Sequence, residues 1–413
     1  MASDAPAPVE VAATPRTRSG FFMAAAFILL PFVTMGGAGA LAPTMAGAGV
    51  LGVPAPRTTV DIRAGGLPLA LGAAFVLWAV LSVLWSPAHP LRDACDFAAA
   101  AIGGTLLALT AGRLLPYDKS LAKRAGAVGL AVLVAFIAVE RWLDYPIGRL
   151  LDPVAAKGGE SNEAALKEAC QRAVASALIC AWGAAALLSA LDKVGAFAIA
   201  VLLGLCISLS LQFGAPYNAA ALGLGVVAAL LAFIWPRAIV SIAAQTIAGW
   251  IVLAPLLLPT LANLAVSGYR QFAGVDAPFT WQARAESWVF VAGKIRERLL
   301  MGWGFESSSN FGDTFPLLGF TLHNIPLHPH NAPLQIWLET GAVGAVLAAS
   351  ALASFGRRAG AALANDRWAA ASAAGALVTA AFLANVNAGA WGLWWWGAIA
   401  VGAGLVRLAR RPV

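Results

Sequence analysis

Three histidines near residue 330 are the side chains most able to do chemistry in this sequence. His323, His328 and His330 fall within eight residues, and the whole chain has only 4 histidines. An unperturbed imidazole has a pKa of about 6.5, so it can take up a proton near neutral pH. We therefore predict that this cluster supplies a general base. The alternative is an interfacial cluster whose rings bond to loop carbonyls or bind a metal adventitiously.

A metal centre is the less favoured interpretation of this cluster. Zinc needs three or four convergent ligands, and the nearest carboxylates, Asp313 and Glu339, lack the spacing of a metal motif. The cysteines lie in or beside apolar runs without CxxC spacing, which indicates packing residues. We expect no metal and no cofactor. The four cysteines are Cys95, Cys170, Cys180 and Cys206.

A polar segment before the histidines carries several cations. Within it, Trp288, Ala292, Ile295 and Leu299 recur at helical spacing, and cationic residues lie around another side of the same helix. This pattern predicts an amphipathic helix with a basic edge. The edge either binds an anion in a cavity or rests on anionic lipid headgroups. The candidate cations of this segment are Arg270, Arg284, Lys294, Arg296 and Arg298.

The helix that follows the histidines is predicted to start at Asn331, whose side chain can cap it. Its free N–H groups and dipole favour a nearby phosphate. Gly341 lies three turns below His330 on nearly the same face, where a small residue permits close packing or leaves room for a lipid chain. Asn331, Gln335 and Glu339 form a polar stripe at a spacing of four. We expect this stripe to face a cavity.

These residues must be positioned by a membrane-embedded helical protein. The 413-residue chain is 60% hydrophobic and 11% charged, with a mean hydropathy of +0.78. So much apolar surface cannot face water, which predicts an all-α polytopic membrane protein. We count about twelve candidate spans of sufficient apolar length. They lie near residues 21–36, 37–54, 65–85, 93–112, 123–141, 170–191, 194–211, 217–236, 238–261, 331–354, 367–387 and 391–409.

The distribution of Lys and Arg predicts the orientation. Cations gather in alternate short loops and in the C-terminal tail, so both termini are expected to be cytoplasmic. The formal charge of +7 then reflects topology and not a nucleic-acid partner. The predicted parts are a cytoplasmic tail (1–20), nine spans (21–262), a large periplasmic loop with the amphipathic helix (263–330), and three spans with a cytoplasmic tail (331–413).

Other features bear on the class of membrane protein. Trp391, Trp394, Trp395 and Trp396 are predicted to form an interfacial belt. Few ionisable residues fall in the middle of a predicted span, and no convincing internal repeat is visible. A twelve-span transporter, which needs functional groups near the membrane midplane, is therefore disfavoured.

The layout resembles the O-antigen ligase and polymerase superfamily. Its members have many spans, one large periplasmic loop near the C-terminal end, and a histidine followed by ten residues and a glycine where the next span starts. Here this pattern is His330, NAPLQIWLET and Gly341. The preceding RAESWVFVAGKIRERLLMGWGF is similar to the family's arginine-containing helix and GxG turn. WAVLSVLWSP, from Trp78 to Pro87, is similar to an early span.

Two features depart from the family pattern. The family's ligases often have a leucine shortly after their arginine; Arg284 is instead followed by Trp288, whereas Arg296 has Leu300 at that spacing. We keep Arg284 as the first candidate and Arg296 as its alternative. Many relatives also have a Ser-Arg pair at the outer end of a middle span, where this chain has Ser210, Leu211 and Gln212. Arg270 would then supply the second cation, unless the subfamily differs.

The resemblance implies a transfer of glycan from undecaprenyl diphosphate to the lipid A core on the periplasmic side of the bacterial inner membrane. A polymerase of O-antigen or exopolysaccharide is the alternative. Arginines would stabilise the diphosphate leaving group, and one base would activate the acceptor hydroxyl without metal or nucleotide. The implied catalytic residues are His330 and Arg284. The implied substrate-binding residues are Arg270, Arg296, Arg298, Asn331, His323, His328, Gln335 and Gly341.

Overall fold

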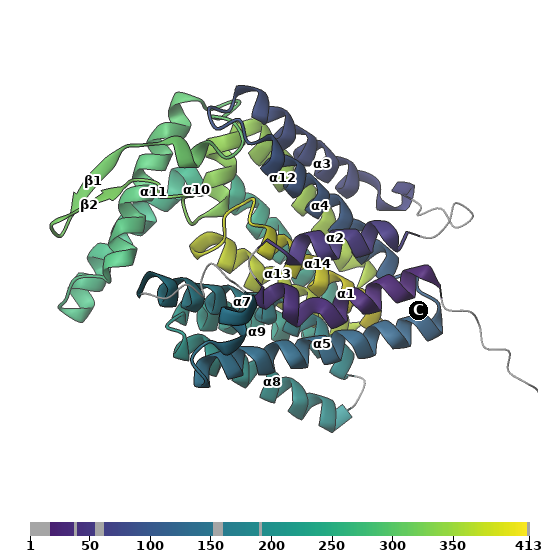
Figure 1. Cartoon of the computed structure of the whole chain (residues 1–413). Helices are drawn as coiled ribbons and strands as arrows, with labels where there is room; N and C mark the ends of the chain where they lie inside the picture. The colour runs from purple at the N-terminus through teal and green to yellow at the C-terminus, as the bar shows by residue number, and fades with distance from the viewer. Residues whose placement is uncertain (1–16, 37–38, 54–61, 152–159, 190–191, 411–413) are drawn as a thin grey trace, which may run out of the picture.

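The structure is a computed structural model, and it describes residues 17–36, 39–53, 62–151, 160–189 and 192–410 (Figure 1). These parts are helical apart from turns and one hairpin of β1 (Thr314–Leu317) and β2 (Phe320–His323). The helices are α1 (Arg18–Met35), α2 (Leu41–Leu51), α3 (Ile62–Leu81), α4 (Leu91–Ala111), α5 (Pro116–Trp142), α6 (Pro146–Leu151), α7 (Glu160–Leu188), α8 (Asp192–Gln212), α9 (Pro216–Ile234), α10 (Pro236–Ala273), α11 (Phe279–Glu297), α12 (Ala332–Ala362), α13 (Arg367–Val386) and α14 (Leu393–Ala409). Two short 3₁₀ segments, η1 (Ser82–Trp85) and η4 (Ser307–Asn310), complete the elements.

The prediction of an all-helical polytopic membrane protein is confirmed. In the described part of the chain, 10 helices are long and apolar enough to cross a membrane, and α2 and α14 are shorter apolar helices. The 11 residues of α2 extend only about 16 Å, against roughly 30 Å of hydrocarbon. The number of twelve spans therefore stays a prediction. Because α10 continues to Ala273, the predicted loop that starts at residue 263 begins inside a helix.

Hydrogen bonds show which helix ends lie together. The backbone N–H of Thr17 donates to the Asp118 carboxylate at 3.1 Å, and Lys119 donates to the Arg410 carbonyl at 2.9 Å. The start of α1, the start of α5 and the end of α14 therefore share one end of the bundle. Just before α14 begins, the Ala390 N–H donates to Gln335 in the first half of α12. The histidine segment thus lies about 26 Å away along α14, at the other end.

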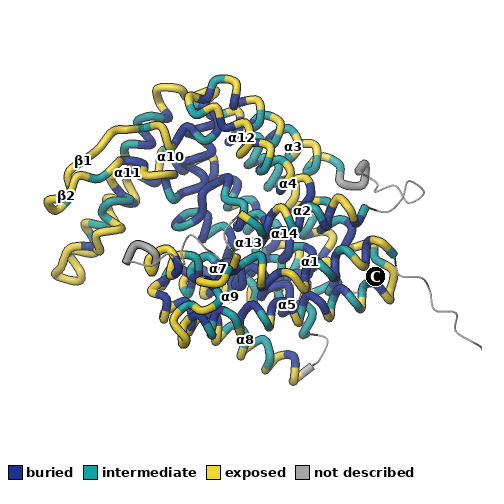
Figure 2. The backbone as a smooth tube through the Cα atoms, in the orientation of Figure 1, coloured by how far each residue is buried: buried dark blue, intermediate teal, exposed yellow. Residues whose placement is uncertain are grey.

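The helices that carry the predicted site form one side of the molecule. Figure 1 shows α10 and α12 side by side, with α11 and the β1–β2 hairpin projecting beyond them. Trp288 and Ile295 of α11 are buried against Leu334 and Leu338 of α12 in one hydrophobic cluster, and Figure 2 shows α11 exposed along its other side. The predicted amphipathic helix is confirmed for Trp288, Ala292 and Ile295, which are all buried. It is wrong for Leu299, which lies beyond the end of α11 at Glu297 and is 50% exposed.

Candidate functional site

Helix α12 is broken at Gly341, where the backbone adopts φ +65° and ψ −167°. A break of this kind frees carbonyl groups that would be costly to leave unpaired inside a membrane. The segment after α11 satisfies them: the Trp303 N–H donates to Leu338 O and the Gly304 N–H to Glu339 O, both at 2.8 Å. The Trp78 indole donates to Thr340 O at 2.8 Å. The first half of α12 is thereby fixed as a separate short helix.

Only glycine fits at this break. A Cβ atom on Gly341 would lie 2.3 Å from the carbonyl oxygen of Leu300 and 2.6 Å from the nitrogen of Gly302. Gly302 also has positive φ, and a Cβ there would lie 2.6 Å from the Glu339 carbonyl. The spacing between His330 and Gly341 is therefore set by backbone packing. A substrate-binding role for Gly341 stays a prediction.

The start of α12 is anchored by buried amide groups. Asn331 caps the helix as predicted, since its side chain accepts from the Leu334 N–H at 3.0 Å. The same amide donates to the Asn385 carbonyl at 3.1 Å, and Trp250 of α10 donates to the Asn385 side chain at 2.6 Å. Asn331 is fully buried. Helices α10 and α13 thus fix the residue that follows His330.

The prediction that the polar stripe faces a cavity is wrong for Gln335 and Glu339. Both side chains are buried, and Gln335 donates to Glu339 at 3.1 Å while accepting from the Ala390 N–H at 2.9 Å. Glu339 also accepts from the Glu306 N–H at 2.6 Å and from the Trp391 indole at 2.5 Å. These groups are held by protein partners, which leaves a contact of Gln335 with substrate as a prediction only.

His330 is held in a left-handed backbone conformation with φ +52°, which is uncommon for a residue other than glycine. Its N–H donates to Nδ1 of His328 at 3.1 Å, and the two ring centroids lie 4.5 Å apart. Between them, the Pro329 carbonyl accepts from the Trp288 indole of α11 at 2.8 Å. Because Nδ1 of His328 accepts a hydrogen bond, this ring is neutral and carries its proton on Nε2.

The surroundings of His330 favour its neutral form. Burial lowers the pKa of His330, and the Arg284 guanidinium lowers it further; the Asn387 backbone and Glu168 act in the opposite direction. Burial, His330 and Arg284 lower the pKa of His328 to about 3. Among the described residues, Nδ1 of His330 has no hydrogen-bond partner although it is buried. An unprotonated imidazole with an unpaired nitrogen can accept a proton from a hydroxyl that enters the site and reaches this buried atom.

Arg284 is the predicted arginine that the structure places near His330. It is half-buried, with its guanidinium 5.1 Å from the centroid of the Trp281 ring, and burial lowers its pKa. In the described part of the chain, it has no carboxylate partner within ion-pair distance. A half-buried guanidinium without a counterion is a favourable site for phosphate oxygens.

His328 and Asn331 adjoin His330, whereas four other predicted binding residues belong to other parts of the structure. Arg270, at the end of α10, is exposed and pairs with Asp276 at 3.4 Å. His323 is exposed at the end of β2. Arg296 follows Arg284 by twelve residues, which is about 18 Å along the axis of α11, and Arg298 lies just beyond. Arg296 and Arg298 therefore form a separate group of cations, and their contact with substrate stays a prediction.

Sequence reasoning missed a polar group at the starts of α7 and α9. Tyr217 lies within electrostatic range of Arg284, Glu168 and Arg172, and Glu168 lies within electrostatic range of His330. Arg172 pairs with Glu168 at 2.5 Å. Gln212, where a second arginine was sought, is exposed and donates to Ser208 at 2.9 Å. Arg172, which like Arg284 lies within electrostatic range of Tyr217, is a candidate for that second cation, although it is paired with Glu168 whereas Arg284 has no carboxylate partner in the described part of the chain. The sequence did contain a signal for Arg172, because an arginine two residues inside the predicted apolar span 170–191 is unusual and indicates a functional role.

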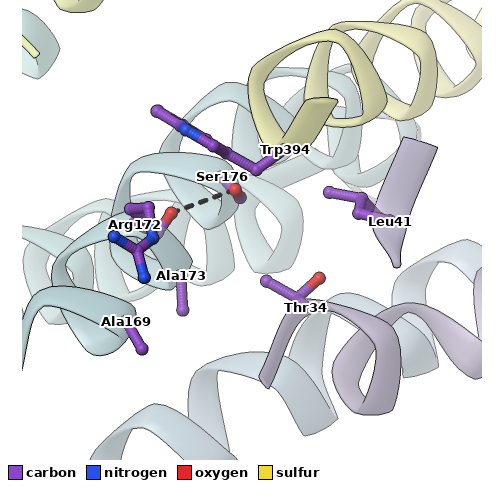
Figure 3. A pocket seen from close by; sticks show the side chains of 7 residues that line it. All are labelled: Thr34, Leu41, Ala169, Arg172, Ala173, Ser176 and Trp394. Carbon is purple, nitrogen blue, oxygen red and sulfur yellow. Dashed lines mark hydrogen bonds between the residues drawn. The ribbon is translucent and has the colours of Figure 1, made fainter. Parts of the chain in front are cut away.

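Figure 3 shows how Arg172 is placed in α7. Its backbone carbonyl accepts from the Ser176 hydroxyl at 3.0 Å, and its side chain lines a cavity together with Thr34 and Trp394. The cavity has a volume of about 10 Å³, which is room for about one water molecule. It is too small for a sugar or a lipid chain, so this cavity itself is not the site of transfer.

Comparisons with known proteins give short similarities to proteins of Rickettsia. The chain is 35% identical over 112 residues to a Rickettsia bellii protein and 48% identical over 64 residues to one of Rickettsia prowazekii. Both are named "putative polysaccharide ligase". The matches span 26% and 14% of this chain, and 27% and 16% of those proteins, so the chain spans about a quarter or less of their length. No protein-family model matches the chain, and no solved structure matches it.

These similarities bear on the predicted resemblance. They support its coarser part, a ligase-like family of glycan-handling proteins. The O-antigen superfamily, the lipid-linked donor and the periplasmic position of the site stay predictions.

Proposed function

We propose that the protein is a glycosyltransferase of the bacterial inner membrane, which moves a glycan from undecaprenyl diphosphate to the lipid A core on the periplasmic side. The observation that carries this proposal is the neutral, half-buried His330 within electrostatic range of the unpaired Arg284, next to the start of α12. The names of the Rickettsia proteins support a ligase-like role in general.

The chemistry assigns one task to each group. His330 takes the proton of the acceptor hydroxyl as that oxygen bonds to C1 of the donor sugar. The bond between C1 and the phosphate oxygen breaks in the same step, and its electron pair leaves with the lipid diphosphate. Arg284, assisted by Arg172, stabilises the charge on that diphosphate. The products are the new glycoside, the lipid diphosphate and a protonated imidazole that returns its proton to water.

The lowered pKa of His330 fits this role in two ways. At neutral pH the His330 ring is unprotonated and can accept a proton. The positive charge of Arg284 disfavours the protonated ring because like charges repel. A charged His330 exists only after proton transfer, when the departing diphosphate brings negative charge beside it. The negative charge would then stabilise the imidazolium when it forms.

A gene-deletion experiment tests the biological role. Deletion of the gene in its own bacterium should leave the lipid A core without attached glycan, and the wild-type gene should restore the attachment whereas His330→Ala should not. His89→Ala is the matched control, because His89 is the fourth histidine and is exposed between α3 and α4. Short glycans retained on the core after deletion would contradict a ligase and indicate a polymerase. Unchanged lipopolysaccharide would contradict both.

A further inference from the structure

A second group of cations lies at the C-terminal end of α11, apart from His330. Arg296 and Arg298 line an open groove of about 590 Å³. Both arginines are exposed, and the groove continues over the exposed loop that leads to Gly302. The other residues that line it are Trp85, Glu297, Leu299, Leu300 and Met301. The groove therefore combines positive charge with apolar surface.

The positive charge of this groove has no acidic partner within the described chain. Glu297 is the one carboxylate that lines the groove, and it already pairs with Lys294 at 3.1 Å. Arg298 lies over the Trp303 ring, with its guanidinium carbon 4.1 Å from the ring centroid. Arg298 is also exposed and has no carboxylate within ion-pair distance in the described part of the chain, so its N–H groups are available to an anion. Two positive charges thus remain available to an anion.

Neighbouring residues indicate the depth of the groove in the membrane. Trp85 ends the apolar stretch Gly66–Trp85, and tryptophan favours the level where lipid headgroups meet the hydrocarbon. Beside it, Leu84 is 80% exposed and Leu300 67% exposed. Such large apolar side chains are stable at an exposed position when lipid chains cover them. Arg296 and Arg298 line the same groove as Trp85 and Leu300, which favours a position near the level of the lipid phosphates.

We propose that this groove binds the phosphate headgroup of an anionic phospholipid of the surrounding membrane. Arg296 and Arg298 hold the phosphate, and Leu299, Leu300 and Met301 contact the acyl chains. Since Arg296 lies about 18 Å from Arg284 along α11, a lipid bound here leaves the His330 site open. The proposal is therefore independent of the glycosyltransferase function, and it gives the amphipathic helix a second attachment to the membrane.

Native mass spectrometry of the purified, delipidated full chain tests the proposal with short-chain phosphatidylglycerol and phosphatidylcholine as probes. We expect the wild type to bind phosphatidylglycerol at least tenfold more tightly, and Arg296→Gln/Arg298→Gln to lose that preference. Arg270→Gln, an exposed and ion-paired arginine of the same region, is the matched control and should retain it. Leu300→Gln should weaken binding of both lipids, because it removes an apolar contact and leaves the charges in place.

Three outcomes would overturn the proposal. These are equal binding of the two lipids by the wild type, unchanged binding in the double arginine variant, and equally tight competition by inorganic phosphate alone. The last would show an anion site that does not recognise a lipid. If the double variant fails to fold, two other measurements test the proposal. The preference of the wild type for phosphatidylglycerol must fall as the salt concentration is raised, and Leu300→Gln must bind both lipids more weakly than the wild type.

Discussion

Replacement of Gly341 by alanine should damage the site through the backbone alone. The backbone angles of Gly341 fall in a region that is essentially restricted to glycine, which costs about 1–3 kcal/mol for another residue. The new Cβ would also lie 2.3 Å from the Leu300 carbonyl oxygen, so the two segments must separate. Separation weakens the bonds of Trp303 and Gly304 to α12, at about 1 kcal/mol each. The expected loss of stability is about 3–5 kcal/mol.

Thermal unfolding in detergent, followed by tryptophan fluorescence, measures this loss. Gly341→Ala should melt several degrees below the wild type, and Gly302→Ala should behave alike because it meets the same backbone from the other side. Gly293→Ala is the matched control: it lies in α11 with no atom within 4 Å of the added Cβ, so it should be neutral or stabilise by about 0.5–1 kcal/mol. If Gly341→Ala melts at the same temperature as the wild type, backbone packing at Gly341 does not explain the spacing between His330 and Gly341.

The remaining predictions concern side chains around the site. His328→Phe, which removes the acceptor for the His330 N–H, should lower transfer at least about tenfold, and His328→Asn should keep more activity; equal rates in the two variants would contradict a role for this hydrogen bond. The acid limb of the transfer rate should lie below pH 6.5 in the wild type and move to higher pH in Arg284→Gln, because the guanidinium lowers the pKa of His330; an unmoved limb would count against that pairing. Burial, Glu339 and Asp93 raise the pKa of Glu306 to about 8, so the folded protein favours the protonated acid and should lose stability as pH rises from about 4.5 to about 8. Glu306→Gln should show a smaller fall in melting temperature over that range, and a fall as large as in the wild type would exclude Glu306 as its source.

Local sequence patterns predicted the features that depend on neighbouring residues. Apolar length gave the spans, the Asn331 side chain gave the start of α12, and helical spacing gave the buried face of α11. Each of these follows from the chemistry of a few adjacent residues. The structure therefore confirms the predictions that depend only on residues close together in the sequence.

Contacts between distant segments could not be predicted in this way. The stripe of Gln335 and Glu339 was expected to face a cavity, yet Glu339 meets Glu306 and Trp391, which lie far away in the sequence. The predicted interfacial belt is wrong for Trp391 and Trp394 for the same reason, since both are buried by packing.

The most direct test of the central claim is the release of lipid diphosphate by the purified protein during glycan transfer. With an undecaprenyl diphosphate-linked glycan and a lipid A core acceptor, the wild type should release one lipid diphosphate for each glycoside formed. His330→Ala should slow this release at least about 100-fold while melting at the same temperature as His89→Ala. Transfer by folded His330→Ala at the wild-type rate would contradict the assignment of the base. A wild type that forms no glycoside from the lipid diphosphate donor would contradict the proposed function itself.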